Sequence, residues 1–124
     1  MPRHRSPALT DAEARVMDVL WKRSSATVAD VVEALKSTRE VSYSTVQTIL
    51  RILELKGYVA HKKVARAFIF RPIVNERQAR RRALRHLMTR LFDGSPSLLV
   101  MNILEDEGID KTELERVKKL IEEA

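Results

Sequence analysis

The chain has 124 residues and a mass of 14.3 kDa, which suits one domain with an appendage. Hydrophobic residues make up 44% of it, enough for a packed core, so we expect a folded chain rather than disorder throughout. The absence of cysteine excludes disulfides, thiolate metal sites and thiol redox chemistry. No apolar run approaches the roughly 20 residues of a membrane span. The start of the chain also lacks the apolar stretch of a signal peptide, so we expect a cytoplasmic protein without membrane insertion.

Charge is distributed unevenly along the chain. Residues 1–92 hold 19 Lys/Arg and 8 Asp/Glu, a net charge of +11, whereas residues 93–124 hold 4 and 9, a net charge of −5, and the two add to the overall +6. This asymmetry indicates that the first part binds a polyanion and that the second part has another role.

The first two predicted helices open with capping pairs. Thr10 and Glu13 form a capping box at the start of the first helix. Its inner face consists of Val16, Met17, Leu20 and Trp21. Thr27 and Asp30 have the same spacing at the start of a second short helix over residues 27–36, and Ser37 to Val41 link it to the next element.

The segment Ser42 to Lys63, SYSTVQTILRILELKGYVAHKK, predicts a DNA-reading helix that leads into a hairpin. Ser42 is the expected N-cap and Gly57 the C-terminal stop. The apolar positions recur at helical spacing and form a face to be buried: Val46, Ile49, Leu50 and Leu53. The other face carries hydroxyl, carboxamide and guanidinium groups, which hydrogen-bond base edges and phosphates: Tyr43, Ser44, Thr45, Gln47, Thr48 and Arg51.

Two strand-like runs follow, Tyr58 to Lys63 and Ala67 to Arg71, around a turn at residues 64–66. This basic hairpin is predicted to contact the sugar-phosphate backbone as a wing, through Lys62, Lys63, Arg66 and Arg71. His61 lies beside these cations and is also expected to meet phosphate. We therefore predict a winged helix-turn-helix DNA-binding domain over residues 9–72.

Three further helices are predicted after Pro72, which breaks the second strand. The first follows the capping residues Asn75 and Gln78 and runs to about Phe92, the second covers Ser97 to Glu107, and the third follows Asp110. Their apolar faces most simply pack against a second copy of the chain. The residues assigned to this dimerisation are Leu84, Leu87, Met88, Leu91, Leu98, Met101, Leu104, Val117, Leu120 and Ile121.

The predicted fold is therefore mainly α with a small β-hairpin wing: a winged helix-turn-helix domain, then a three-helix dimerisation region over residues 73–124. The alternative for these last helices is packing back on the chain's own winged helix. His4, His61 and His86 show no metal-ligand spacing, and neither a Walker loop nor a G-x-G-x-x-G motif occurs, so we predict no metal, no cofactor and no enzyme. Three other functions remain open: a ligand-responsive winged-helix regulator, an architectural DNA-binding protein without sequence preference, and a module that pairs only with a protein.

Three blocks together resemble the penicillinase repressor (BlaI/MecI) family: LTDAEARVMDVLW (Leu9 to Trp21), TVQTILRILELKG (Thr45 to Gly57) and SLLVMNILEDEGIDKTELERVKKLIEE (Ser97 to Glu123). The resemblance implies a homodimeric repressor that occupies a palindromic operator in double-stranded DNA. The repressed gene would encode a β-lactamase or another resistance or stress protein. It also implies partners that end repression: a membrane sensor peptidase, or a downstream protease, and a cut within the dimerisation region.

The resemblance places that cut at the bond between Asn102 and Ile103, where Ile replaces the more usual Phe. Asn is a mediocre helix former among apolar neighbours, and a cut there detaches Ile103 to Ala124. The chain departs from the staphylococcal members at Ser44 and Gln47, where Lys and Arg face the DNA. The operator sequence is therefore not carried over from the family.

Overall fold

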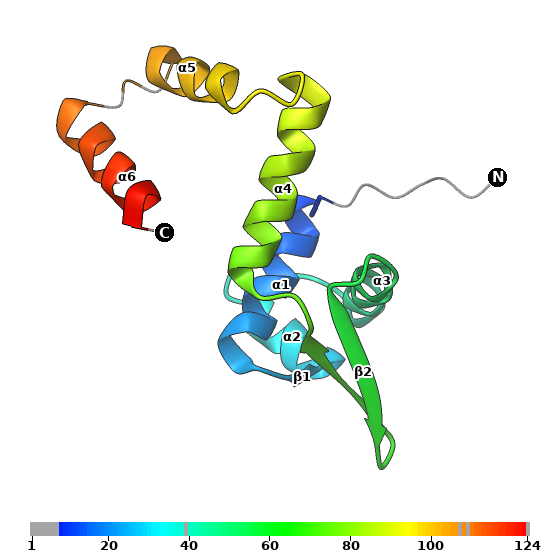
Figure 1. The fold of residues 1–124 in the computed structure, drawn as a ribbon. Helices are drawn as coiled ribbons and strands as arrows, with labels where there is room; N and C mark the ends of the chain where they lie inside the picture. Colours follow the sequence, from blue (N-terminus) through cyan, green and yellow to red (C-terminus); the bar gives the residue numbers. More distant parts are fainter. Residues whose placement is uncertain (1–7, 39, 107, 109, 124) are drawn as a thin grey trace. The chain divides into compact units, whose positions relative to one another are not determined.

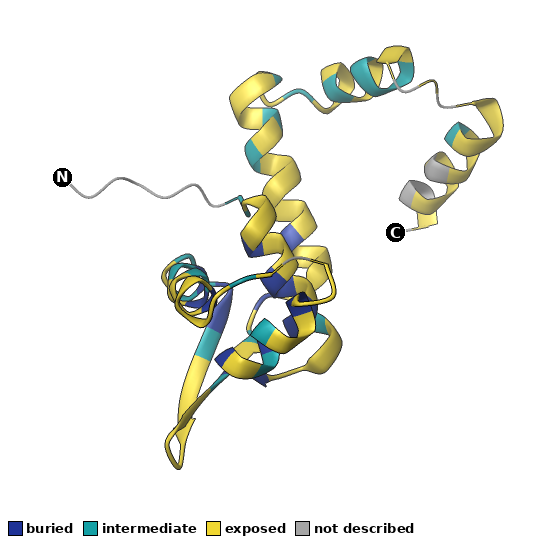
Figure 2. Cartoon of the chain, turned by 180° about the vertical axis from the view of Figure 1, so that it is seen from behind, coloured by how far each residue is buried: buried dark blue, intermediate teal, exposed yellow. Residues whose placement is uncertain are grey.

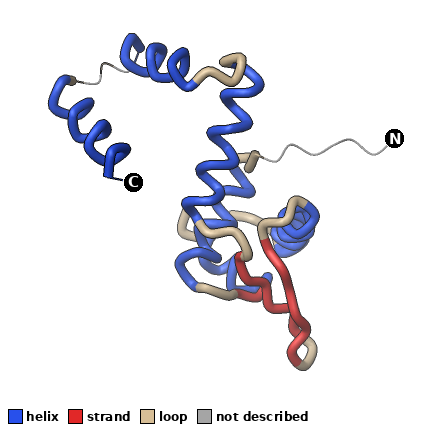
Figure 3. The backbone as a smooth tube through the Cα atoms, in the orientation of Figure 1, coloured by secondary structure: helices blue, strands red, loops and turns tan. Residues whose placement is uncertain are grey.

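A computed structural model describes residues 8–38, 40–106, 108 and 110–123, except for the side chains of Val117, Ile121 and Glu122. The elements of the first part are α1 (Asp11–Arg23), β1 (Ala26–Thr27), α2 (Val28–Leu35), α3 (Tyr43–Leu55), β2 (Val59–Val64) and β3 (Ala67–Pro72) (Figure 1). Those of the second part are α4 (Glu76–Leu91), α5 (Pro96–Asp106) and α6 (Lys111–Glu123), all helical (Figure 3). The predicted fold class, mainly α with a small β wing, is confirmed.

Every helix start that the sequence predicted from capping residues is present. Thr10 with Glu13, Thr27 with Asp30 and Asn75 with Gln78 form reciprocal pairs of backbone-to-side-chain hydrogen bonds. Ser42 accepts from the Thr45 amide and Asp110 from the Glu113 amide. These caps satisfy amides that the helices themselves leave without partners, so the local sequence fixes where each helix begins.

The end of α3 turns the chain directly into the wing. Gly57 has a φ of 81°, its amide donates to the Glu54 carbonyl, and the Tyr58 amide donates to the Leu53 carbonyl at 2.9 Å. This pair of hydrogen bonds is a Schellman motif, which favours glycine because the left-handed conformation strains other residues. Tyr58 is fully buried immediately after the turn, so the start of β2 is fixed against the core.

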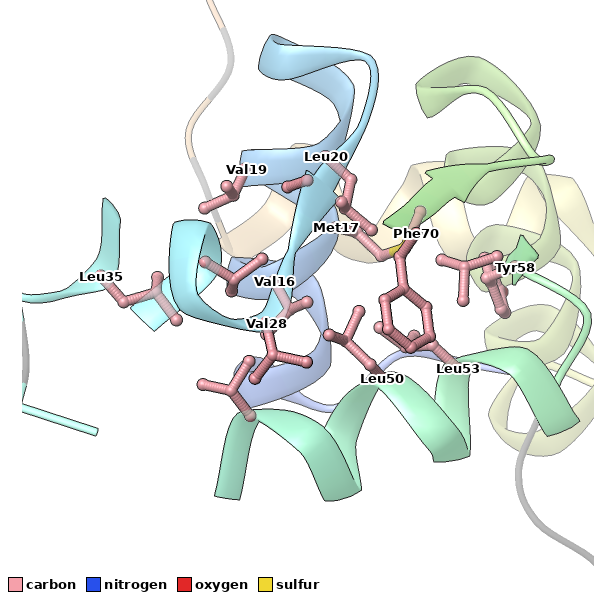
Figure 4. Packing of buried hydrophobic residues seen from close by; sticks show 14 of the residues in the cluster. Val16, Met17, Val19, Leu20, Val28, Leu35, Leu50, Leu53, Tyr58 and Phe70 are labelled. Atoms are coloured by element: carbon pink, nitrogen blue, oxygen red, sulfur yellow. The ribbon is translucent and has the colours of Figure 1, made fainter. Parts of the chain in front are cut away.

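The hydrophobic core lies among α1, α2, α3 and the base of the sheet. Figure 4 shows side chains from α1 and α3 converging on Phe70 and Tyr58. The residues of α1 and α3 with no exposed surface are Val16, Met17, Leu20, Val46, Leu50 and Leu53. Burying each such side chain contributes about 1.5–3 kcal/mol. Trp21 is only partly buried, and its Nε1 donates to the Val74 carbonyl at 2.9 Å, which holds the chain after β3 against α1.

The sheet has three strands in the order β1-β3-β2, all antiparallel. The sequence predicted the hairpin of β2 and β3 but not β1, in which Ala26 pairs with Phe70 and Thr27 with Ile69. A two-residue strand is too short to show an alternating pattern. β1 nevertheless supports the wing, because its pairing with the middle of β3 attaches the hairpin to the segment between α1 and α2.

The chain divides into two compact units, residues 1–84 and 85–124, with the boundary inside α4. Ala79, in the first half of α4, is buried with the winged-helix core.

α5 has no buried residue, as Figure 2 also shows. Of the residues predicted for dimerisation, Leu84, Leu87, Leu91, Leu98, Met101 and Leu120 are exposed in the single chain, Met88 and Leu104 are half-buried, and the side chains of Val117 and Ile121 lie outside the described residues. No helix in the described part of the chain is long and apolar enough to cross a membrane.

Candidate nucleic-acid interface

The outer face of α3 carries the residues predicted to read DNA. Because each residue turns a helix by about 100°, Ser44, Thr48 and Arg51 lie on the side opposite the buried Val46 and Leu50. Tyr43, Thr45 and Gln47 flank this stripe, and all six predicted residues are exposed. The polar and the buried faces of α3 are therefore separated as the sequence predicted.

The hydroxyl groups at the start of α3 already have local partners. The Ser42 and Thr45 hydroxyls share a hydrogen bond of 2.8 Å, and the Thr48 hydroxyl donates to the Ser44 carbonyl at 2.9 Å. The side chains of Gln47 and Arg51, by contrast, form no hydrogen bond or ion pair with any described residue. Carboxamide and guanidinium groups make bidentate contacts with adenine and guanine in the major groove. Gln47 and Arg51 are therefore the side chains of α3 best able to recognise bases.

The wing is a hairpin whose two faces differ. His61 pairs with Phe70 and Lys63 with Phe68, so these residues share one face of the sheet, and strand alternation places Lys62 on the other. The Lys63 ammonium lies 5.8 Å from the centre of the Phe68 ring. The turn at the tip has Ala65 at a φ of 57°, and the exposed Arg66 follows it. The cations of the wing thus face two directions rather than forming a single row.

A groove runs between α3 and the wing. Its two adjoining parts share Gln47, Phe68 and Phe70. The groove also brings together predicted site residues from both elements, namely Tyr43 and Arg51 of α3 with His61 and Arg66 of the hairpin. Ser44, Thr45, Thr48, Lys62 and Lys63 do not line it.

His61 is tied to α3 by its neighbours. Its Nδ1 is in hydrogen-bond contact with the Glu54 carboxylate, and its ring centre is 5.3 Å from the centres of both Phe68 and Phe70. These contacts join the first strand of the wing to the second half of α3. They give His61 a partner within the chain that the sequence did not predict.

Phe68 is a residue of the interface that the sequence analysis did not single out. It lies on β3, lines both parts of the groove and remains 45% exposed, although Phe70 two residues later is buried. An apolar ring in this position can pack against a thymine methyl group. The alternation in AFIFRP, which puts both phenylalanines on one face of the strand, is the sequence signal that indicates it.

The start of α2 forms another part of the groove wall through Thr27, Val28 and Ala29. The pKa of the Asp30 carboxyl is lowered below 3.8, chiefly by the hydrogen bond from the Thr27 backbone amide. The hydrogen bond from the Thr27 hydroxyl and the nearby charge of Arg23 lower this pKa further. Asp30 therefore remains charged at neutral pH, and it stabilises the helix end that positions this wall.

Comparison with known proteins identifies relatives of the whole chain and of its first part. The family model for the penicillinase repressor matches residues 9–123. The penicillinase repressor of Bacillus licheniformis is 32% identical over 117 residues, which cover 94% of this chain and 91% of that protein. A solution structure of the DNA-binding domain of the repressor BlaI has a TM-score of 0.52 and 38% identity, covering 60% of this chain and 90% of that one. The monomeric form of Bacillus licheniformis BlaI in complex with the blaP half-operator has a TM-score of 0.50, with the same identity and coverage.

Proposed function

This chain belongs to the penicillinase repressor family of transcriptional repressors, and we propose that it represses transcription by binding an operator in double-stranded DNA. The observation that carries the proposal is the placement of Gln47 and Arg51. Both are exposed, both lack partners among the described residues, and both line the groove between α3 and the wing. The complex of the Bacillus licheniformis relative with a half-operator supports the same role for this winged helix.

In this proposal α3 and the wing have different tasks. The outer stripe of α3 enters the major groove, where Gln47 and Arg51 hydrogen-bond base edges and the neighbouring hydroxyls add contacts. Lys62, Lys63 and Arg66 of the wing contact phosphates, which sets the register but carries no sequence information. The ring of Phe68 packs beside them against a sugar or a thymine methyl group.

We propose that the operator is palindromic and that a homodimer binds it. One winged helix reaches only a half-site, and a two-fold dimer matches two half-sites that lie about one helical turn, or a multiple of one, apart. The exposed leucines of α4 and α5 support an interface in the second part of the chain, because such surfaces in the single chain favour association. The region over residues 73–124 is proposed to provide it.

Release from DNA is proposed to follow cleavage between Asn102 and Ile103. Both residues are half-buried in α5, where the side-chain Nδ2 of Asn102 donates to the Leu98 carbonyl at 2.8 Å. No residue of α5 is buried within the single chain, so only the proposed dimer contacts oppose the local opening that a protease requires. The cut would remove α6 and the end of α5, and with them part of the proposed dimer interface.

The test of operator recognition is selection from randomised duplexes with the full-length chain. We expect enrichment of a two-fold symmetric sequence, and a Gln47→Ala, Arg51→Ala variant should enrich that sequence far less. An Arg15→Ala variant, changed at an exposed position of α1 away from the groove, serves as the control. Binding without enrichment of any sequence would instead indicate an architectural protein.

A further inference from the structure

The helix α4 concentrates positive charge that the proposed DNA contacts do not use. It contains one acidic residue, Glu76, and six arginines, at positions 77, 80, 81, 82, 85 and 90, so its net charge is +5. Arg77, Arg81 and Arg85 follow one another at four-residue intervals. They form one stripe along the helix with a rise of about 6 Å between neighbours, which we call the arginine stripe.

The arginine stripe has no counter-charge within the described part of the chain. Arg80 pairs with Glu76 at 2.8 Å, and the Arg82 guanidinium lies 5.1 Å from the centre of the Tyr58 ring. The three arginines of the stripe form no ion pair with any described carboxylate. Like charges four residues apart destabilise a helix, so the stripe weakens α4 unless an anion from outside neutralises it.

The stripe runs beside the apolar surface of the same helix. Leu84, Leu87 and Leu91 are 47%, 38% and 65% exposed in the single chain. At about 100° per residue, the arginine stripe borders these leucines and lies on the side of α4 nearly opposite the buried Ala79. Charged residues that border an apolar helix face are the usual rim of a helix-helix interface, where they select the partner and its orientation.

The chain itself contains a surface of opposite charge. Glu105 and Asp106 end α5, both exposed, and neither pairs with a described cation. Residues 93–124 as a whole carry a net charge of −5, against +5 for α4. The six ion pairs identified among described residues involve groups from Glu13 to Arg80, and none of them includes Glu105 or Asp106.

The lengths of the two helices are compatible with a pairing of these charges. Asp106 lies about 15 Å along α5 from Pro96, and Arg81 lies about 15 Å along α4 from Leu91. An α5 that packs antiparallel to an α4, with Pro96 beside Leu91, brings its acidic end level with Arg81 and Arg85. The apolar side chains of both helices then meet in the same contact.

We propose that the arginine stripe of α4 binds the acidic end of α5 from a second copy of this chain. Two-fold symmetry forms this contact twice, and the charges steer the two copies into one orientation before the leucines pack. The inference rests on the homodimer of the proposed function, and it adds that complementary charge, in addition to apolar burial, holds the dimer together.

Charge reversal in the full-length chain tests the pairing. One variant carries Arg81→Glu with Arg85→Glu, a second carries Glu105→Arg with Asp106→Arg, and a control carries Arg15→Glu with Lys22→Glu on α1. All these side chains are exposed, and circular dichroism checks the fold. Sedimentation equilibrium gives the dimer dissociation constant of each protein at low and high salt.

We expect wild-type dimerisation to weaken about tenfold or more from 0.05 to 0.5 M salt, because salt screens exposed charges. Each interface variant alone should dimerise at least about tenfold more weakly, since like charges then meet, while the control remains near wild type. An equimolar mixture of the two interface variants should form a heterodimer of near wild-type affinity, because both contacts then join opposite charges.

Other outcomes overturn the inference. If the stripe pairs with the acidic end of its own chain, the mixture of the two variants will dimerise as weakly as its components. If the stripe instead binds DNA, the Arg81→Glu, Arg85→Glu variant will dimerise as the wild type does but will bind a half-site duplex more weakly. A dimer unaffected by salt and by charge reversal would refute the charge pairing but leave the proposed repressor intact. A wild-type chain that is monomeric at every salt concentration would refute the proposed homodimer itself.

Discussion

The Lys56 ammonium lies 2.6 Å from the Glu13 carboxylate, and both side chains are only 6% exposed. Lys56 also donates to the Ala8 carbonyl at 3.0 Å, and the same Glu13 oxygen accepts from the Thr10 amide. This ion pair fixes the C-terminal end of α3 to the start of α1. It therefore holds the helix that we propose to read DNA in place on the core.

Replacing Lys56 with methionine should destabilise the fold strongly, because the Glu13 carboxylate then remains buried without a cation. The expected loss in the free energy of unfolding is about 3 kcal/mol or more. Urea unfolding followed by the fluorescence of Trp21 measures it. The control is Lys36→Met, which removes an exposed pair with Glu33 worth about 0–1 kcal/mol. Equal losses in the two variants would contradict the structural role of the buried pair.

The capping carboxylate of α2 should make stability depend on acid pH. The hydrogen bond from the Thr27 amide keeps the pKa of Asp30 in the folded state below 3.8, so its contribution is complete above that pH and is lost as the pH falls through the folded pKa. An Asp30→Asn variant should be about 0.3–1 kcal/mol less stable at pH 7. Urea unfolding at pH 7 and at pH 3 should show this difference shrinking in acid; a constant difference would show that the charge has no part in it.

Local sequence signals predicted the helices well, because capping residues and apolar periodicity act over a few residues. They placed Thr10, Thr27, Ser42 and Asn75 at helix starts and the buried side of α3 inside the core. They did not indicate contacts between distant residues, such as the pair of Lys56 with Glu13 or β1 against β3.

The candidate interface was predictable to a similar extent. Exposed polar residues on one helix face indicated Gln47 and Arg51, because the helical period assigns each residue to a face. The contact of His61 with Glu54, by contrast, depends on how the hairpin turns back over α3, and Phe68 appeared as one more apolar residue of a strand. Tertiary packing, which no short pattern encodes, decided both.

Truncation after Leu84 should leave a folded monomer. Residues 1–84 form one compact unit that contains every buried core residue of the described part of the chain, and an isolated DNA-binding domain of the repressor BlaI has been solved in solution. The truncated chain should bind a half-site duplex but should lose the added affinity of two linked contacts on the full operator. Sedimentation and fluorescence anisotropy test this. A truncated protein that still dimerises at micromolar concentration would place the interface in the winged helix.

Substitution at the proposed cleavage bond should block induction. In cells that carry an Asn102→Ala, Ile103→Ala variant, the repressor should remain intact after the inducing signal, whereas mass spectrometry of the wild type should detect the fragment that ends at Asn102. Ser97→Ala on the same helix is the control and should be cleaved normally. Induction with an intact wild-type chain, or with a cut elsewhere, would show another mechanism of release.

The most direct measurement of the central claim is the ratio of affinities for the selected operator and for random DNA at one salt concentration. Arg51→Ala should lower this ratio, because a base contact is lost. The loss should correspond to about 1–3 kcal/mol in the difference between the two binding free energies. Lys62→Ala with Lys63→Ala should instead weaken binding to both DNAs similarly and reduce the salt slope by about one for each phosphate contact. Equal losses on operator and random DNA from Arg51→Ala would contradict the assignment of α3 as the reading helix.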